Sequence, residues 1–243
     1  MELNSFENVY MNGGNGPNFD VDSVERIIKA EPLEVLAQSS ACKIVNAEIE
    51  STEIVLKIIG INAGSVPNIT RELCALQMLS NSPSDISLIV QYHGYVTYRT
   101  ENNIAIMFDF INGPTLENWI NRPMHSNPTI AGPGEDSCFL RKEIILGICK
   151  GLQRIHSLVC AHNDMKPGNI ILKLPNFVPI ILDLGIATLP ETKRTLEGAQ
   201  GTKKLKVGIR TAYFKTGSVS KGYTLGYAAP EQLTNDERGF ASD

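Results

Sequence analysis

His162-Asn163-Asp164-Met165-Lys166-Pro167-Gly168-Asn169 is the most informative segment of this chain, and Asp183-Leu184-Gly185 follows it fourteen residues after Asn169. The two segments contribute two carboxylates (Asp164 and Asp183), two side-chain amides (Asn163 and Asn169) and one ammonium group (Lys166). Carboxylate and amide oxygens are the hard ligands that Mg²⁺ prefers. A lysine beside them supplies positive charge for phosphate, and a carboxylate can orient an attacking hydroxyl. The pattern therefore predicts phosphoryl transfer.

Hydrophobic periodicity divides the rest of the chain into a strand-rich first part and a more helical second part. Strands are expected over residues 36–47, 48–59, 86–98, 103–111, 170–172 and 178–182. Helices are expected over 22–32, 70–79 and 115–120, and a long, largely buried helix over 140–156. Residues 1–29 are expected to form a mobile tail.

Five motifs, in this order along the chain, resemble those of the protein kinase family. Ile54-Val55-Leu56-Lys57 resembles the strand that carries a lysine, and Arg71-Glu72-Leu73 the helix whose glutamate pairs with it. The two segments quoted above resemble the catalytic loop and the Asp-Phe-Gly motif, and Ala229-Pro230-Glu231 the end of the activation segment. The resemblance covers residues 36–243. It implies an α+β fold with a β-rich small lobe (30–111) and an incomplete helical large lobe (112–243).

The resemblance also implies catalytic and metal-binding roles. Asp164 would accept or orient the proton of the substrate hydroxyl, and Lys166 would contact the transferred phosphate. Asn169 and Asp183 would bind Mg²⁺. Lys57, paired with Glu72, would hold the α- and β-phosphates of ATP.

Adenine would bind between the lobes, according to the same resemblance. Phe108 falls at the gatekeeper position, and residues 109–111 at the hinge, with Asp109 and Ile111 at its ends. Ile44 would lie above the base and Ile171 below it. A hydrophobic spine linking the lobes would include Leu76, Tyr92, His162 and Leu184.

The implied substrate is a protein with a Ser or Thr acceptor. Lys166, two residues after Asp164, is the usual choice of Ser/Thr kinases. Thr224 occupies the position of a threonine that hydrogen-bonds the catalytic loop. Small-molecule phosphotransferases with a kinase-like fold are an alternative, but they usually lack this lysine and the Ala-Pro-Glu motif.

Two motifs depart from the family pattern. The three glycines of the family's Gly-rich loop are replaced here by Ala37, Ser39 and Cys42. The absence of these glycines should loosen contact between backbone N–H groups and phosphate. A pseudokinase that binds nucleotide or protein is therefore a second hypothesis. Asn163 replaces the arginine that commonly receives an activation-loop phosphate, so activity is not expected to depend strictly on loop phosphorylation.

The C-terminal part raises two further expectations. Residues 191–221 are basic and form either an acidic-substrate dock or a solvated, mobile insert. Asp243 resembles the aspartate that anchors the catalytic loop in the family. Family members continue beyond this point, so we expect a fragment that exposes apolar surface, in which Glu231 lacks its usual arginine partner.

Composition restricts the class of protein. The 243 residues carry a net charge of −4, which gives no general attraction to nucleic acid or an anionic membrane. The first ten residues lack the pattern of a signal peptide, so none is expected, and no apolar run reaches spanning length. The five cysteines show no CxxC pair and are expected to be buried in helices in a reducing compartment. A cytoplasmic location follows as an expectation; the oligomeric state stays open.

Overall fold

The computed structural model describes residues 11–12, 34–49, 51–80, 87–98, 102–121, 135–158, 161–189, 223–234 and 240–243. The helix expected over 22–32 and the basic stretch 191–221 lie outside these residues. Within the segment expected to be a mobile tail, only β1 (Met11–Asn12) is described, and it pairs with β5.

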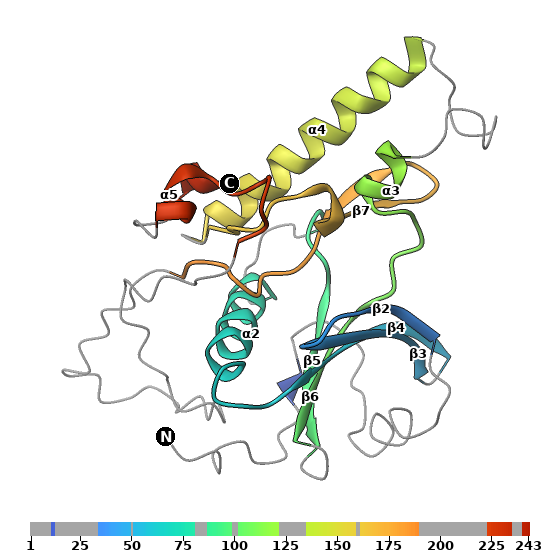
Figure 1. Ribbon diagram of the computed structural model, residues 1–243. Coiled ribbons are helices and arrows are strands. Elements are labelled where there is room, and N and C mark those ends of the chain that lie inside the picture. Colours follow the sequence, from blue (N-terminus) through green and yellow to red (C-terminus); the bar gives the residue numbers. More distant parts are fainter. Residues whose placement is uncertain are drawn as a thin grey trace, which may run out of the picture.

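The small lobe is a six-stranded antiparallel sheet in the order β1-β5-β6-β4-β3-β2 (Figure 1). Its strands are β2 (Glu34–Gln38), β3 (Cys42–Ile49), β4 (Thr52–Gly60), β5 (Tyr92–Tyr98) and β6 (Asn103–Asp109). The strand expected over 36–47 is two strands, because the chain turns at Ser39–Cys42. Likewise, the strand expected over 86–98 begins only at Tyr92.

Alternation along β4 gives the sheet two different faces. Ile54 and Leu56 are fully buried against β3, β5 and β6 on one face. Since successive side chains point to opposite sides, Lys57 lies on the other face with Val55 and Ile59, which belong to the cluster beneath α2.

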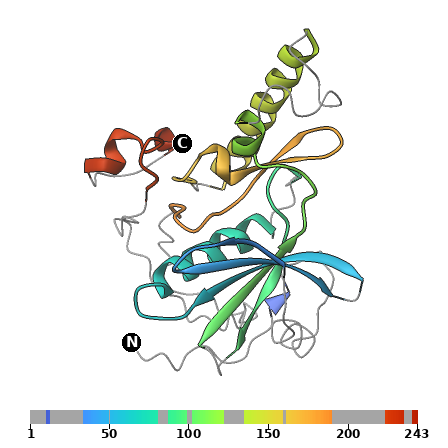
Figure 2. The same ribbon diagram turned by 45° about the vertical axis from the view of Figure 1, so that its right-hand side comes forward.

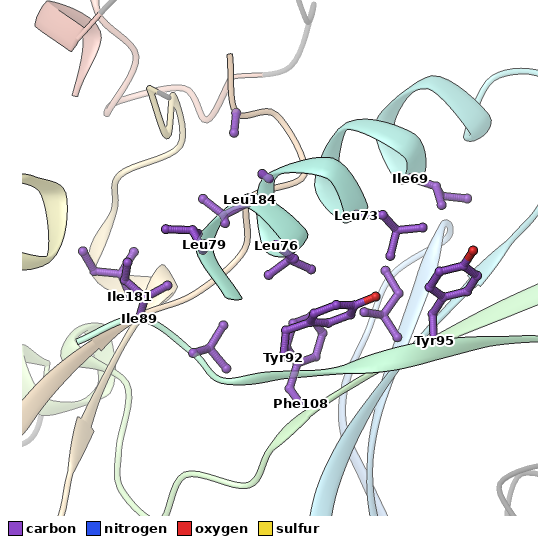
Figure 3. Packing of buried hydrophobic residues seen from close by; sticks show 14 of the residues in the cluster. Ile69, Leu73, Leu76, Leu79, Ile89, Tyr92, Tyr95, Phe108, Ile181 and Leu184 are labelled. Atoms are coloured by element: carbon purple, nitrogen blue, oxygen red, sulfur yellow. The ribbon is translucent and has the colours of Figure 1, made fainter. Parts of the chain in front are cut away.

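Helix α2 (Val66–Ser80) covers that second face and begins four residues before the expected start at residue 70. The side chain of Asn62 accepts hydrogen bonds from the N–H groups of Gly64 and Ser65, which fixes the turn before the helix. Leu73 and Leu76 point from α2 toward Tyr92 and Tyr95 of the sheet (Figure 3). The packing of α2 on this face determines where Glu72 lies.

The large lobe is mainly helical above a short hairpin (Figures 1 and 2). Its elements are α3 (Leu116–Ile120), α4 (Glu135–His156), β7 (Ile170–Lys173), β8 (Val178–Ile181) and α5 (Pro230–Thr234), with 3₁₀ turns at Pro167–Asn169 and Phe240–Ser242. Thr115 caps α3 by accepting a hydrogen bond from Asn118 N–H. Helix α4 packs closely on β8, where a Cβ at Gly147 would lie 2.5 Å from Pro179.

Helix α4 is buried along only one stripe, so the expectation of a largely buried helix was wrong in part. Ile144 and Ile155 are buried, whereas Ile145 and Leu146 are exposed. Positions 144 and 145 are about 100° apart around a helix, and the cluster with Ile170 and Leu172 covers only the side of Ile144. The expectation for cysteines was also wrong in part: Cys138 and Cys149 are exposed on α4, and Cys42 lies in β3 rather than in a helix. None of the helices described is long and apolar enough to cross a bilayer.

Backbone hydrogen bonds join the lobes, and the segment that leaves β6 packs closely on β7 of the large lobe. Val90 N–H donates to Ile181 O, and Ile181 N–H donates to Leu88 O, so the segment before β5 lies beside β8. After β6 the chain passes β7, where a Cβ on Gly113 would lie 2.0 Å from the carbonyl oxygen of Leu172. The bilobal α+β architecture expected from the sequence is confirmed.

Candidate active site

Lys57, Glu72 and Asp183 form a charged cluster between the lobes. Lys57 Nζ lies 2.6 Å from Glu72 Oε1 and 2.7 Å from Asp183 Oδ1. The Glu72 side chain is 3% exposed, whereas that of Asp183 is 42% exposed. The cluster joins β4, α2 and the segment after β8, so it depends on the correct packing of three parts of the chain. The ion pair expected between Lys57 and Glu72 is present.

The electrostatics of this cluster favour the charged forms of Lys57 and Asp183. Burial lowers the pKa of Lys57, but the charges of Glu72 and Asp183 outweigh it and raise this pKa above its usual value. Burial also raises the pKa of Glu72, and Lys57 only partly offsets this. For Asp183, the attraction of Lys57 and hydrogen bonds from Lys57 and Gly185 N–H outweigh burial and lower the pKa.

Asp164 is the centre of a second polar network. Lys166 Nζ donates to Asp164 Oδ2 and to Thr224 Oγ1, both at 2.8 Å, and Thr224 Oγ1 donates to Asp164 Oδ1 at 2.7 Å. Asn169 Nδ2 donates to the carbonyl oxygen and to Oδ2 of Asp164 at 2.8 and 2.9 Å. The carboxylate is therefore held in one orientation beside an ammonium group. The hydrogen bond expected of Thr224 to the catalytic loop is present.

His162 and Asn163 connect the loop to the chain after β8. The fully buried His162 donates from Nε2 to Leu182 O, while its Nδ1 accepts from Asp164 N–H, which fixes the ring tautomer. Asn163 has a left-handed φ of 65°, a conformation that asparagine tolerates. Its Nδ2 donates to Ile186 O and Thr188 Oγ1. Asn163 thus makes neutral hydrogen bonds at a position where the family commonly has an arginine.

Asp243 and Gln232 form hydrogen bonds with the backbone of the catalytic loop. Asp243 accepts hydrogen bonds from the N–H groups of His162 and Asn163 at 2.8 and 2.6 Å, as its resemblance to the family anchor implies. The buried Gln232 donates to Asn163 O and accepts from Ala229 N–H. Glu231 accepts a hydrogen bond from Ser242 Oγ, whereas the usual partner of this glutamate in the family is an arginine.

The residues expected to bind adenine are distributed over both lobes. Phe108 pairs with Val55 across the sheet and contacts Tyr92, with ring centroids 6.3 Å apart. Asp109 ends β6, and Ile111 packs at the edge of the central cluster. Two further residues, Ile44 of β3 and Ile171 of β7, are each half-buried on opposite lobes and belong to none of the hydrophobic clusters. The contacts do not bring Ile44 and Ile171 together.

The donor set fits a Mg²⁺ ion shared with a phosphate ligand. Both side-chain hydrogen bonds of Asn169 use Nδ2, which leaves the amide oxygen as a ligand, and Asp183 is partly exposed. Within the described ranges, no three His, Cys, Asp or Glu side chains cluster as metal ligands. Mg²⁺ commonly takes one or two protein oxygens and completes its shell with phosphates and water, so two donors suffice.

Comparison with known proteins identifies the family. The model of the protein kinase domain matches residues 37–243, which includes both polar networks and all strands from β3 to β8. The chain belongs to the protein kinase family. Hence the ion pair of Lys57 with Glu72 and the loop around Asp164 lie within a kinase domain.

Individual kinases resemble this chain at modest identity. It is 32% identical to serine/threonine-protein kinase C of Synechocystis over 44% of this chain and 23% of that protein. It is 27% identical to mitogen-activated protein kinase kinase 7 of Arabidopsis thaliana over 65% of this chain and 47% of that kinase. It is 24% identical to mitogen-activated protein kinase kinase 9 of the same plant over 88% of this chain and 57% of that kinase. The chain therefore matches about half or less of the length of most of these kinases.

Several residues that shape the site were not found by sequence reasoning. Gln232 has no motif of its own, and its partner Asn163 lies 69 residues earlier. Asn163 stands where the family commonly has an arginine, and its hydrogen bond to Thr188 Oγ1 became visible only in the folded structure. No spacing rule could have identified either one. Ser39 was noted only as a missing glycine, although its hydroxyl organises the β2–β3 turn.

Proposed function

We propose that this chain is an ATP- and Mg²⁺-dependent protein kinase that phosphorylates Ser and Thr hydroxyls of protein substrates. The supporting observation is the presence of two separate polar networks. One places Lys57 between Glu72 and Asp183, and the other holds Asp164 beside Lys166. The first suits phosphate and metal binding, and the second suits orientation of a hydroxyl.

Each residue of the proposal has a distinct role. Lys57 would bind the α- and β-phosphates of ATP, while Asn169 and Asp183 would hold Mg²⁺, which neutralises phosphate charge when bound. The acceptor hydroxyl forms its bond to the γ-phosphorus as the bond to ADP breaks. Asp164 accepts the hydroxyl proton, and Lys166 stabilises the transferred phosphate.

The remaining binding residues support the same proposal. Phe108 and Asp109 end β6, and Ile111 follows on the way to the large lobe, where the backbone would bond adenine. Ile44 and Ile171 offer half-buried apolar surface from the two lobes, which suits a planar base.

The specificity for Ser/Thr rests on Lys166 and Thr224, which close a triangle of hydrogen bonds with Asp164. The names of the kinases similar to this chain agree with it, since they include serine/threonine-protein kinases. With its net charge of −4, the protein is proposed to act on proteins in the cytoplasm rather than on nucleic acid or membranes.

The test is transfer of labelled phosphate from ATP to a library of Ser-, Thr- and Tyr-containing peptides. We expect labelling of Ser and Thr peptides that requires Mg²⁺ and is lost in Asp164→Asn. Glu143→Gln, at an exposed position of α4, serves as a control variant. Labelling that survives Asp164→Asn unchanged would refute the role of Asp164. Labelling of Tyr peptides alone would refute the specificity.

A second candidate is a pseudokinase that binds nucleotide or protein without transfer. It is favoured by Ala37, Ser39 and Cys42, which stand where glycines usually approach phosphate. Thermal stabilisation by Mg·ATP in a protein that labels no peptide, not even itself, would favour this candidate.

A further inference from the structure

The β2–β3 turn adjoins the charged cluster. In the β3–β4 pairing, Ile44 lies opposite Lys57 and Cys42 lies opposite Ile59. The turn from Ser39 to Cys42 therefore ends two residues before Ile44, the residue that pairs with Lys57 across the sheet. Burial chiefly raises the pKa of the Cys42 thiol, and the charge of Lys57 lowers it in part, which agrees with a thiol close to that ammonium group.

The Ser39 hydroxyl occupies the concave side of this turn. Its Oγ accepts hydrogen bonds from the N–H groups of Ala41 at 3.3 Å and Cys42 at 3.1 Å. It also donates to Cys42 O at 3.3 Å. The backbone bond from Ser39 N–H to Cys42 O, at 2.8 Å, closes the turn independently of the side chain.

Two successive N–H groups that converge on one oxygen form an anion-binding arrangement. A phosphate oxygen requires the same donors in the same direction. In this chain those donors are already bonded to a neutral hydroxyl of the turn itself. Both bonds are longer than the usual 2.9–3.0 Å, so a charged oxygen can displace the hydroxyl.

We propose that Ser39 sets the nucleotide affinity of this site by competing with a phosphate oxygen for the N–H groups of Ala41 and Cys42. The inference rests on the proposed ATP binding. Phosphate binds the turn only when the Ser39 side chain rotates away, so the competition weakens phosphate-bearing ligands selectively. A ligand with no phosphate is insensitive to it.

The test is calorimetric binding of Mg·ATP and of adenosine to the full chain. Ser39→Ala removes the hydroxyl and leaves the backbone bond of the turn. We expect it to tighten ATP binding about fivefold, the effect of freeing one net hydrogen bond, and to leave adenosine binding unchanged. Ser39→Thr retains a hydroxyl and should keep the wild-type affinity. Ser40→Ala, on the neighbouring exposed serine, is the matched control and should also bind like wild type.

The results separate this inference from the proposed function. Unchanged or weaker ATP binding in Ser39→Ala overturns the inference, and so does equal tightening for adenosine. If neither the wild type nor Ser39→Ala binds ATP, both proposals fail. Tighter ATP binding in a protein that labels no peptide supports the role of Ser39 and refutes phosphoryl transfer.

Discussion

The carboxylate of Asp243 accepts a hydrogen bond of 2.6 Å from the backbone N–H of Asn163, eighty residues earlier in the chain. The same carboxylate accepts from His162 N–H and bonds His156 Nε2, and its side chain is only 1% exposed. Two adjacent amides of the catalytic loop thus depend on one distant anion.

Replacing this anion should destabilise the loop. Asp243→Ala leaves two buried N–H groups without an acceptor, and we expect a loss of about 2–4 kcal/mol in the free energy of unfolding. Asp243→Asn retains one acceptor oxygen and should lose about half as much. Urea denaturation measures both. A variant Asp243→Ala as stable as wild type would contradict the anchoring role.

The pair of Lys57 and Glu72 should show strong coupling. Lys57→Met leaves the Glu72 carboxylate buried without its cation, which typically costs about 3–5 kcal/mol. Adding Glu72→Gln removes that charge and should recover most of the loss. A double-mutant cycle in urea gives the coupling, and additive effects would show that the two charges do not interact.

The acid dependence of stability should change in Asp183→Asn. The pKa of Asp183 is lower in the folded protein than its ordinary value of 3.8, so its ionisation stabilises the fold above that value. This contribution is lost as the pH falls through the folded pKa. The stability difference between wild type and Asp183→Asn should therefore be constant between about pH 6 and 8 and shrink below about pH 4. A difference that grows on acidification would contradict the lowered pKa.

The tie between Asn163 and Thr188 should order the segment after Asp183 without phosphate. Thr188→Val removes the acceptor, and we expect faster amide hydrogen exchange over residues 183–189 and lower transfer activity. Thr188→Ser keeps a hydroxyl and is the matched control. Treatment of the wild type with phosphatase should leave its activity unchanged. Strict loss of activity after that treatment would show that Asn163 does not replace phosphate-dependent ordering.

The segment that enters the large lobe after β6 should tolerate no side chain at Gly113. Its Cβ would lie 2.0 Å from the carbonyl oxygen of Leu172, so Gly113→Ala must displace backbone and should cost about 3 kcal/mol. Gly60→Ala is the control, because its Cβ would meet its nearest neighbour, Asn103, at 3.7 Å. Thermal unfolding compares the two variants, and equal midpoints would contradict the close approach.

Local patterns predicted much of the architecture. Strands β4 and β6, helix α3 and the β7–β8 hairpin lie within a few residues of their predicted ranges, since alternation and capping are encoded locally. Burial was predicted less well. Whether Ile145 of α4 is covered depends on which elements pack around the helix, and periodicity does not specify them.

The candidate site likewise contains residues that sequence motifs identified and residues that only the structure revealed. Motif spacing identified Lys57, Glu72, Asp164 and Asp183, and the fold brings them into two networks. Gln232 and Thr188 act through partners far away in the chain, so their contribution required the structure. Ser39 required hydrogen-bond geometry, because a serine in place of glycine does not reveal which amides it binds.

The largest hydrophobic cluster contains residues of both lobes, among them Leu76 of α2, Tyr92 of β5, and Ile181 and Leu184 from the other side (Figure 3). Neither lobe can therefore lose its structure without exposing apolar surface of the other. We expect the described parts of the two lobes to melt together, in one cooperative transition by calorimetry. A ligand bound to either lobe would then raise the melting temperature of the whole.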